Sequence, residues 1–282
     1  MNLFNLFSEI ETRDPEVFEE ISNRRDALKQ FTSSAGKIAL TALPFAIGSL
    51  FEKAYGGPPP ATSVVLTVLN FALTLEYLEQ GFYYEGLQSK SLIPDTADYD
   101  TFITIRTHEK EHVAFLQSAI KSLGGTPVAL PTFDYTGGSG SGNGPFADVF
   151  TNYETFLDLA QAFEDTGVRA YKGQAATLVG GGALLTAALD IHSVEARHAS
   201  AVRQLRYTLS YSTTKPWITL GDSGISSAFN SNYGGEQNLI QAGINIVDIN
   251  GFNINEDAAS EAFDEPLSIT RVQNLVKPFI AS

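Results

Sequence analysis

The sequence contains one pattern of polar residues twice, at nearly the same spacing in its two halves. In each copy, a glutamate is followed by a tyrosine seven residues later and by a Glu-x-x-His group 33 or 31 residues later. If the four segments are helices that meet in one core, four carboxylates and two imidazoles converge there, which is a ligand set for two metal ions. The two copies are Glu76, Tyr83, Glu109 and His112, and then Glu164, Tyr171, Glu195 and His198.

The pattern lies in segments whose apolar residues recur at helical spacing. We expect helices over about 61–89, 98–123, 148–179 and 183–209, with Asp98 as the N-cap of the second. A glycine-rich loop over 126–145 separates the second helix from the third, and its length suits a crossover connection. The expected fold class is therefore all-α, a four-helix bundle with a long crossover between helices two and three.

The ligand positions match in depth along the expected helices. Glu76 lies 13 residues before the first helix ends, and Glu109 lies 11 residues after the second begins. Glu164 lies 17 residues before Gly181, and Glu195 lies 14 residues after it. These differences of two and three residues are less than one turn of about 3.6 residues. Both helical hairpins should therefore bring their glutamates and histidines to the same level.

Composition excludes several other kinds of protein. A formal net charge of −14, without a basic cluster, argues against nucleic acid as a partner. The absence of cysteine excludes disulfides, thiolate metal sites and cysteine nucleophiles. With 282 residues, of which 43% are hydrophobic, the chain can bury a sizeable core.

The two ends of the chain differ from the central part. Residues 1–56 are expected to form an N-terminal extension, in which Arg24-Arg25 precedes the uncharged stretch Ile38–Phe51 and suits a twin-arginine-type export signal. This stretch of 14 residues is shorter than the roughly 20 that a spanning helix needs, so no integral membrane segment is expected. We expect a periplasmic or exported protein, or otherwise a cytoplasmic one whose extension packs on the bundle. Residues 210–282 are expected to be an irregular, Asn/Gly-rich tail that wraps the bundle.

Four segments of the central part resemble those of a known family. They are Leu75–Glu79, Glu109–Val113, Glu164 and Val194–Ala199. They resemble the ferritin-like superfamily over about residues 60–210, and more narrowly the bacterial and plant ferritin-like proteins associated with desiccation. The resemblance implies a ferritin-like bundle at 57–209 that binds two iron or manganese ions. The ligands that it implies are Glu76, Glu109, His112, Glu164, Glu195 and His198.

Other polar residues share the expected ligand faces. Tyr83 and Tyr171 either hydrogen-bond a ligating carboxylate from the facing helix or are ordinary core tyrosines. Glu79, three residues after the first lone glutamate, is an alternative ligand or an outer partner of one. His192 could also be an outer partner, because it lies three residues before the second Glu-x-x-His group. Asp165 is expected to be a solvated or capping residue.

The first copy of the pattern also fits a zinc enzyme. His108, Glu109 and His112 match the His-Glu-x-x-His pattern, in which two histidines bind zinc and the glutamate is a general base. No obvious third ligand follows, and Val194 stands at the position that corresponds to His108 in the second copy. A zinc metallohydrolase is therefore the minor alternative.

Two functions remain open for the expected metal site. One is an oxidoreductase that acts on a small oxidant, oxygen or peroxide. The other is a non-catalytic bundle associated with stress or desiccation, which stores or sequesters metal or protects surfaces or partners, and in which the metal site is structural or vestigial. The sequence indicates no catalytic residue beyond the ligands. We expect a monomer or small homo-oligomer, because a hollow ferritin-style shell would have to accommodate the extension and the tail.

Overall fold

A computed structural model describes residues 60–281 of the chain. The expected N-terminal extension, its export signal and its boundary at residue 56 lie outside the described residues. Within residues 60–281, no helix is both long enough and apolar enough to cross a membrane.

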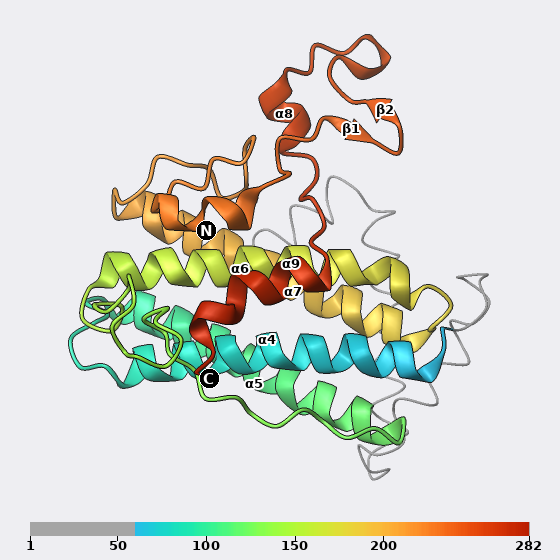
Figure 1. The fold of residues 1–282 in the computed structure, drawn as a ribbon. Coiled ribbons are helices and arrows are strands. Elements are labelled where there is room, and N and C mark those ends of the chain that lie inside the picture. Colours follow the sequence, from blue (N-terminus) through green and yellow to red (C-terminus); the bar gives the residue numbers. More distant parts are fainter. Residues whose placement is uncertain (1–59, 282) are drawn as a thin grey trace, which may run out of the picture. The chain divides into compact units, whose positions relative to one another are not determined.

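Four long helices make up the bundle in the described part of the chain. They are α4 (Thr62–Gln88), α5 (Thr96–Ser122), α6 (Tyr153–Ala175) and α7 (Ala183–Thr208). The helix α4 packs along α5 and α6 packs along α7, so the bundle consists of two helical hairpins (Figure 1). A short 3-10 helix, η1 (Ala176–Leu178), continues α6 before the turn to α7. The all-α bundle expected from the sequence is confirmed.

Two helices begin two or more residues away from their expected starts. The second begins at Thr96 rather than at 98, because the side chain of Asp95 accepts a hydrogen bond from the backbone N–H of Ala97. Asp98 lies in the first turn and accepts a hydrogen bond from the hydroxyl of Tyr153. The third helix begins five residues later than expected, where the Asn152 side chain caps the N–H groups of the first turn.

The crossover between α5 and α6 is organised by one buried carboxylate. Asp134 accepts hydrogen bonds from the backbone N–H groups of Thr136, Gly140 and Gly142, and from the Thr136 hydroxyl. Gly140 and Gly142 both have a positive φ, which glycine adopts without the steric cost that other residues incur. The glycine-rich run is therefore a compact loop folded around Asp134.

The C-terminal residues are joined to this loop and to the bundle. Helix α9 (Ile269–Val276) and the 3-10 helix η4 (Lys277–Phe279) lie against the bundle (Figure 1). The backbone N–H of Asp134 donates to the carbonyl of Phe279, and that of Ser139 donates to the carbonyl of Pro278. The rest of the tail holds η2 (Ser227–Tyr233), the two-stranded antiparallel hairpin β1 (Ile240–Gln241) and β2 (Ile244–Asn245), η3 (Ile249–Gly251) and α8 (Glu256–Ser260).

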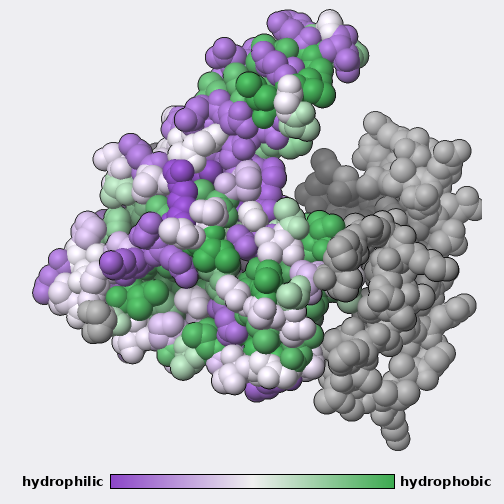
Figure 2. All heavy atoms as spheres, turned by 45° about the vertical axis from the view of Figure 1, so that its right-hand side comes forward, coloured by the Kyte–Doolittle hydropathy of each residue, from purple (hydrophilic) through white to green (hydrophobic). Residues whose placement is uncertain are grey.

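Buried charged side chains attach the tail to α6 and α7. The sequence indicated that Asp165 is a solvated or capping residue, and this prediction was wrong. Asp165 is buried, pairs with Arg203 at 2.5 Å and accepts a hydrogen bond from the Tyr233 hydroxyl. Arg169 donates to the backbone carbonyl of Glu265 in the tail and forms a buried ion pair with Glu236. The tail removes these groups from water, a step that is tolerated when each charge has a partner. Figure 2 shows hydrophobic and hydrophilic residues interspersed over one face of the described part.

Candidate metal centre

The structure brings the six predicted ligand residues together in the middle of the bundle. Each of the four helices contributes at least one of them, as the sequence pattern required, and the four glutamates have no exposed surface at all. The ligand atoms fall into two groups, and within each group all of them lie within 4.8 Å of one another. The groups are Glu76, Glu109, His112 and Glu195, and then Glu109, Glu164, Glu195 and His198. Glu109 and Glu195 belong to both groups, so the two candidate ion positions are adjacent.

Each histidine faces more carboxylate oxygens than one N–H group can satisfy. The Nδ1 atom of His112 lies 3.1 Å from Glu76 Oε2, 3.2 Å from Glu109 Oε2 and 3.1 Å from Glu195 Oε1. The Nδ1 atom of His198 lies 2.8 Å from Glu109 Oε1 and 3.3 Å from Glu164 Oε2. One imidazole nitrogen donates a single hydrogen. Hydrogen bonds alone therefore do not account for this convergence.

Within residues 60–281, several buried atoms of the centre have no hydrogen-bond partner of suitable geometry, although some of them lie within ion-pair distance of one another. They are Glu109 Oε1, Glu164 Oε2, both carboxylate oxygens of Glu195, and His198 Nδ1. Leaving such groups unpaired is costly. Atoms that bind one cation at about 2.1 Å in octahedral geometry lie about 3 Å apart, which matches the nitrogen–oxygen separations around both histidines. The unpaired atoms and their spacing thus fit a pair of metal ions.

Burial also sets the charge of the centre. The pKa of Glu76 is raised to about 7 and that of Glu195 to about 8, mainly because burial removes both carboxylates from water. For His198, burial alone would lower the pKa, but the neighbouring carboxylates, Glu164 first, raise it to about 11. In the metal-free protein, protons bound by these groups therefore offset part of the negative charge of the centre. Metal ions would take the place of those protons.

Two tyrosines hold the lone glutamates from the opposite hairpin. The hydroxyl of Tyr83 on α4 donates to Glu164 Oε1 on α6 at a distance of 2.5 Å. The hydroxyl of Tyr171 on α6 donates to Glu76 on α4 in the same way. Burial and the adjacent carboxylates raise the pKa of both tyrosines well above the usual value, so both stay protonated and act as donors. Each hydrogen bond fixes one carboxylate oxygen and leaves the other free to face the centre.

The comparison with protein families agrees with this geometry. The model of the ferritin-like domain family matches residues 65–208, which is half of the chain and includes all six candidate ligands. The chain belongs to the ferritin-like domain family. A search of curated proteins found no match. The narrower resemblance to desiccation-associated proteins stays a prediction.

Glu79 lies beside the centre of this ferritin-like bundle but outside both groups of ligand atoms. Its side chain is 2% exposed and forms no hydrogen bond or ion pair within residues 60–281. A Cβ atom on Gly167 would lie 3.0 Å from Glu79 Oε1 and 3.4 Å from Glu195 Oε2. A glycine inside a helix costs about 1 kcal/mol relative to alanine, and at this position it leaves room for two carboxylates. His192 is half-buried on α7 and also lies outside both groups.

His108 touches the centre in a way that the sequence did not reveal. Its ring stacks on the ring of His198 with the centroids 5.2 Å apart, and its Nδ1 lies 2.9 Å from His198 Nε2. Because Nδ1 of His198 faces the carboxylates, His108 contacts the nitrogen on the far side of that ring. Within residues 60–281, neither group of potential ligands contains His108, so the pair of histidines that a zinc metallohydrolase needs is not formed with His112. The His-Glu-x-x-His spacing indicated that His108 is a zinc ligand, whereas in the structure His108 contacts the ring of His198.

Proposed function

We propose that this ferritin-like protein binds two iron or manganese ions between its four long helices and uses them in redox chemistry of oxygen or peroxide. The proposed ligands are Glu76, Glu109, His112, Glu164, Glu195 and His198. The observation that carries the proposal is the pair of four-residue groups that share Glu109 and Glu195, all of them buried. A shared carboxylate can offer one oxygen to each of two neighbouring cations, and each histidine can bind one of them terminally.

The chemistry of the donors supports the choice of metal. Carboxylate oxygens and imidazole nitrogens suit iron and manganese, and zinc less specifically. Bound iron or manganese would supply one-electron redox steps and polarise a bound oxygen atom. The protein would hold the carboxylates in place through Tyr83 and Tyr171, and exclude bulk water by burying the ligands.

A second candidate function is a non-catalytic bundle with a structural metal site. The observation in its favour is the complete burial of the four glutamates, which keeps large substrates away from the centre. In that case metal would stabilise the fold, because an ion that binds only the folded state shifts the folding equilibrium. Turnover with a small oxidant separates the two functions, since only the first requires it.

The test is the metal content of the full chain and of matched variants. Protein purified without added metal, or reconstituted anaerobically, should hold about two iron or manganese ions per chain, as expected for a di-metal bundle. Glu164→Ala and His198→Ala should lose metal and keep the helical circular dichroism. The controls are Glu154→Ala, at an exposed position of the same helix α6, and His192→Ala on α7.

The outcomes separate the ligand assignment from the redox function. Unchanged metal content in Glu164→Ala or His198→Ala would refute the ligand assignment. A wild-type protein that cannot be loaded with metal would refute both candidate functions. Loaded protein whose absorbance stays constant in air and in peroxide would refute the redox function and leave the structural one.

A further inference from the structure

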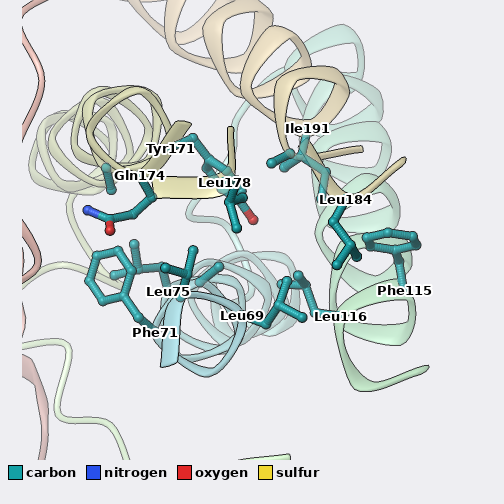
Figure 3. Close-up of a pocket in the computed structure, with 14 residues that line it drawn as sticks. Leu69, Phe71, Leu75, Phe115, Leu116, Tyr171, Gln174, Leu178, Leu184 and Ile191 are labelled. Atoms are coloured by element: carbon teal, nitrogen blue, oxygen red, sulfur yellow. The ribbon is translucent and has the colours of Figure 1, made fainter. Parts of the chain in front are cut away.

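An apolar cavity lies next to the candidate metal centre, inside the bundle. All four long helices and η1 line it, and Figure 3 shows Leu69, Leu75, Leu116 and Leu178 around it. It is narrow: about 20 Å³ is open to the centre of a water-sized sphere, which is room for one or two small molecules. Its walls are almost entirely hydrocarbon.

The cavity lies at most about one helical turn from the ligands. Leu75 directly precedes Glu76, and Ile191 is four residues before Glu195 on α7. One turn of a helix rises about 5.4 Å. Tyr171 forms part of the wall, and its hydroxyl donates to Glu76. A molecule in the cavity is therefore separated from the centre only by side chains that adjoin the ligands.

The wall of the cavity reaches the surface between α5 and α7. Phe115 lies beside Leu184 there (Figure 3), and the side chain of Phe115 is 37% exposed. Leu184 and Ala188 are half-buried on α7. Rotation of the Phe115 and Leu184 side chains, which form no hydrogen bonds, would admit a small molecule past the small side chain of Ala188.

We propose that this cavity binds dioxygen and delivers it to the metal centre, and that it excludes hydrogen peroxide. The inference rests on the proposed redox function and deepens it by naming the oxidant. Water and peroxide lose their hydrogen bonds in an apolar cavity, where an unpaired polar group costs several kcal/mol. Dioxygen forms no strong hydrogen bonds with water and does not incur this cost. Of the polar side chains in the wall, the Tyr171 hydroxyl already donates to Glu76, and the amide of Gln174 points toward the edge of the cavity (Figure 3).

Xenon tests the cavity without any metal. Xenon is an apolar atom that binds dry protein cavities, so metal-free protein should change the xenon NMR shift in a saturable way. Ala188→Phe fills the cavity and should abolish this specific shift, and Ala188→Leu serves if the larger change disturbs the fold. Ala201→Phe, the same substitution at an exposed position of α7, is the matched control and should keep the wild-type shift. No specific shift in the wild type, or an equal shift in the filled variant, would overturn the proposed site.

Oxidation of iron-loaded protein tests the choice of oxidant. Filling the cavity should slow oxidation by dioxygen roughly tenfold or more, equivalent to about 1.4 kcal/mol in the barrier. Oxidation by hydrogen peroxide should keep its wild-type rate, because peroxide would not use this route. Equal slowing with both oxidants, or with neither, would overturn the oxygen assignment. A wild-type protein that takes up no metal would end the proposed function and the oxygen assignment together, whereas xenon binding would still report the cavity.

Discussion

Substitution of Tyr83 by phenylalanine should weaken metal binding without unfolding the bundle. The change removes the hydroxyl that donates to Glu164 Oε1 at 2.5 Å and keeps the ring, which stacks on Phe102 with the centroids 5.7 Å apart. A hydrogen bond to a charged group contributes about 1.5–3 kcal/mol. If most of this fixes the orientation of Glu164 toward the metal, the affinity should fall about 10–100-fold, as is typical for an outer partner of a ligand.

The assay is a titration of metal-free protein with Mn²⁺ or Co²⁺ in competition with a chelator. Tyr84→Phe is the matched control, because Tyr84 is the next residue on the same helix and its side chain is 44% exposed. Tyr171→Phe should reproduce the loss, because Tyr171 donates to the equivalent glutamate of the other hairpin. Equal affinities in Tyr83→Phe and Tyr84→Phe, with circular dichroism unchanged in both, would refute the role given to the Tyr83 hydroxyl.

Two further predictions concern stability, each measured by denaturant unfolding of the full chain. Asp134→Asn should destabilise the protein by about 1–2 kcal/mol at pH 7. Hydrogen bonds from Thr136 and two glycine N–H groups lower the pKa of Asp134 to about 2, so the stability advantage of the wild type should vanish as the pH falls from about 4 to 2. A stability difference between wild type and variant that stays constant over this pH range would contradict the role given to the carboxylate. Arg203→Met should cost about 3–5 kcal/mol because it leaves Asp165 buried and uncompensated. Lys215→Met, which breaks an exposed ion pair, should cost less than about 1 kcal/mol, and similar losses in both would argue against burial as the cause.

The starts of helices show where sequence reasoning loses precision. Apolar periodicity locates the middle of a helix well, because many residues contribute to the pattern. A helix start depends on which polar side chain reaches the first free N–H groups, and neighbouring candidates compete. Asp95 takes this role instead of Asp98, and Asn152 takes it four residues after the predicted start of the third helix. Such choices are settled by local backbone geometry rather than by periodicity.

The candidate site also contains features that the sequence predicted and features that it did not. The sequence pattern indicated which glutamates and histidines would meet, because i,i+3 spacing and matched depth follow from helix geometry alone. It gave no sign that His108 would stack on His198, since these residues are 90 positions apart and the contact depends on how α5 approaches α7. Asp165 looked like a surface residue because nothing local shows that Tyr233 of the tail would cover it. That the six residues bind metal stays a prediction.

By itself, the sequence of this protein determined its helical bundle, its family and the set of residues that meet in the middle. Those features repeat along the chain with the period of the helix, so they can be read without knowing any long-range contact. The tertiary structure alone decided the partners of each group: which tyrosine holds which glutamate, which atoms remain unpaired, and where an apolar cavity is left. These features depend on packing between helices, where a shift of about an ångström makes or breaks a contact. The periodic pattern of the sequence does not predict such contacts.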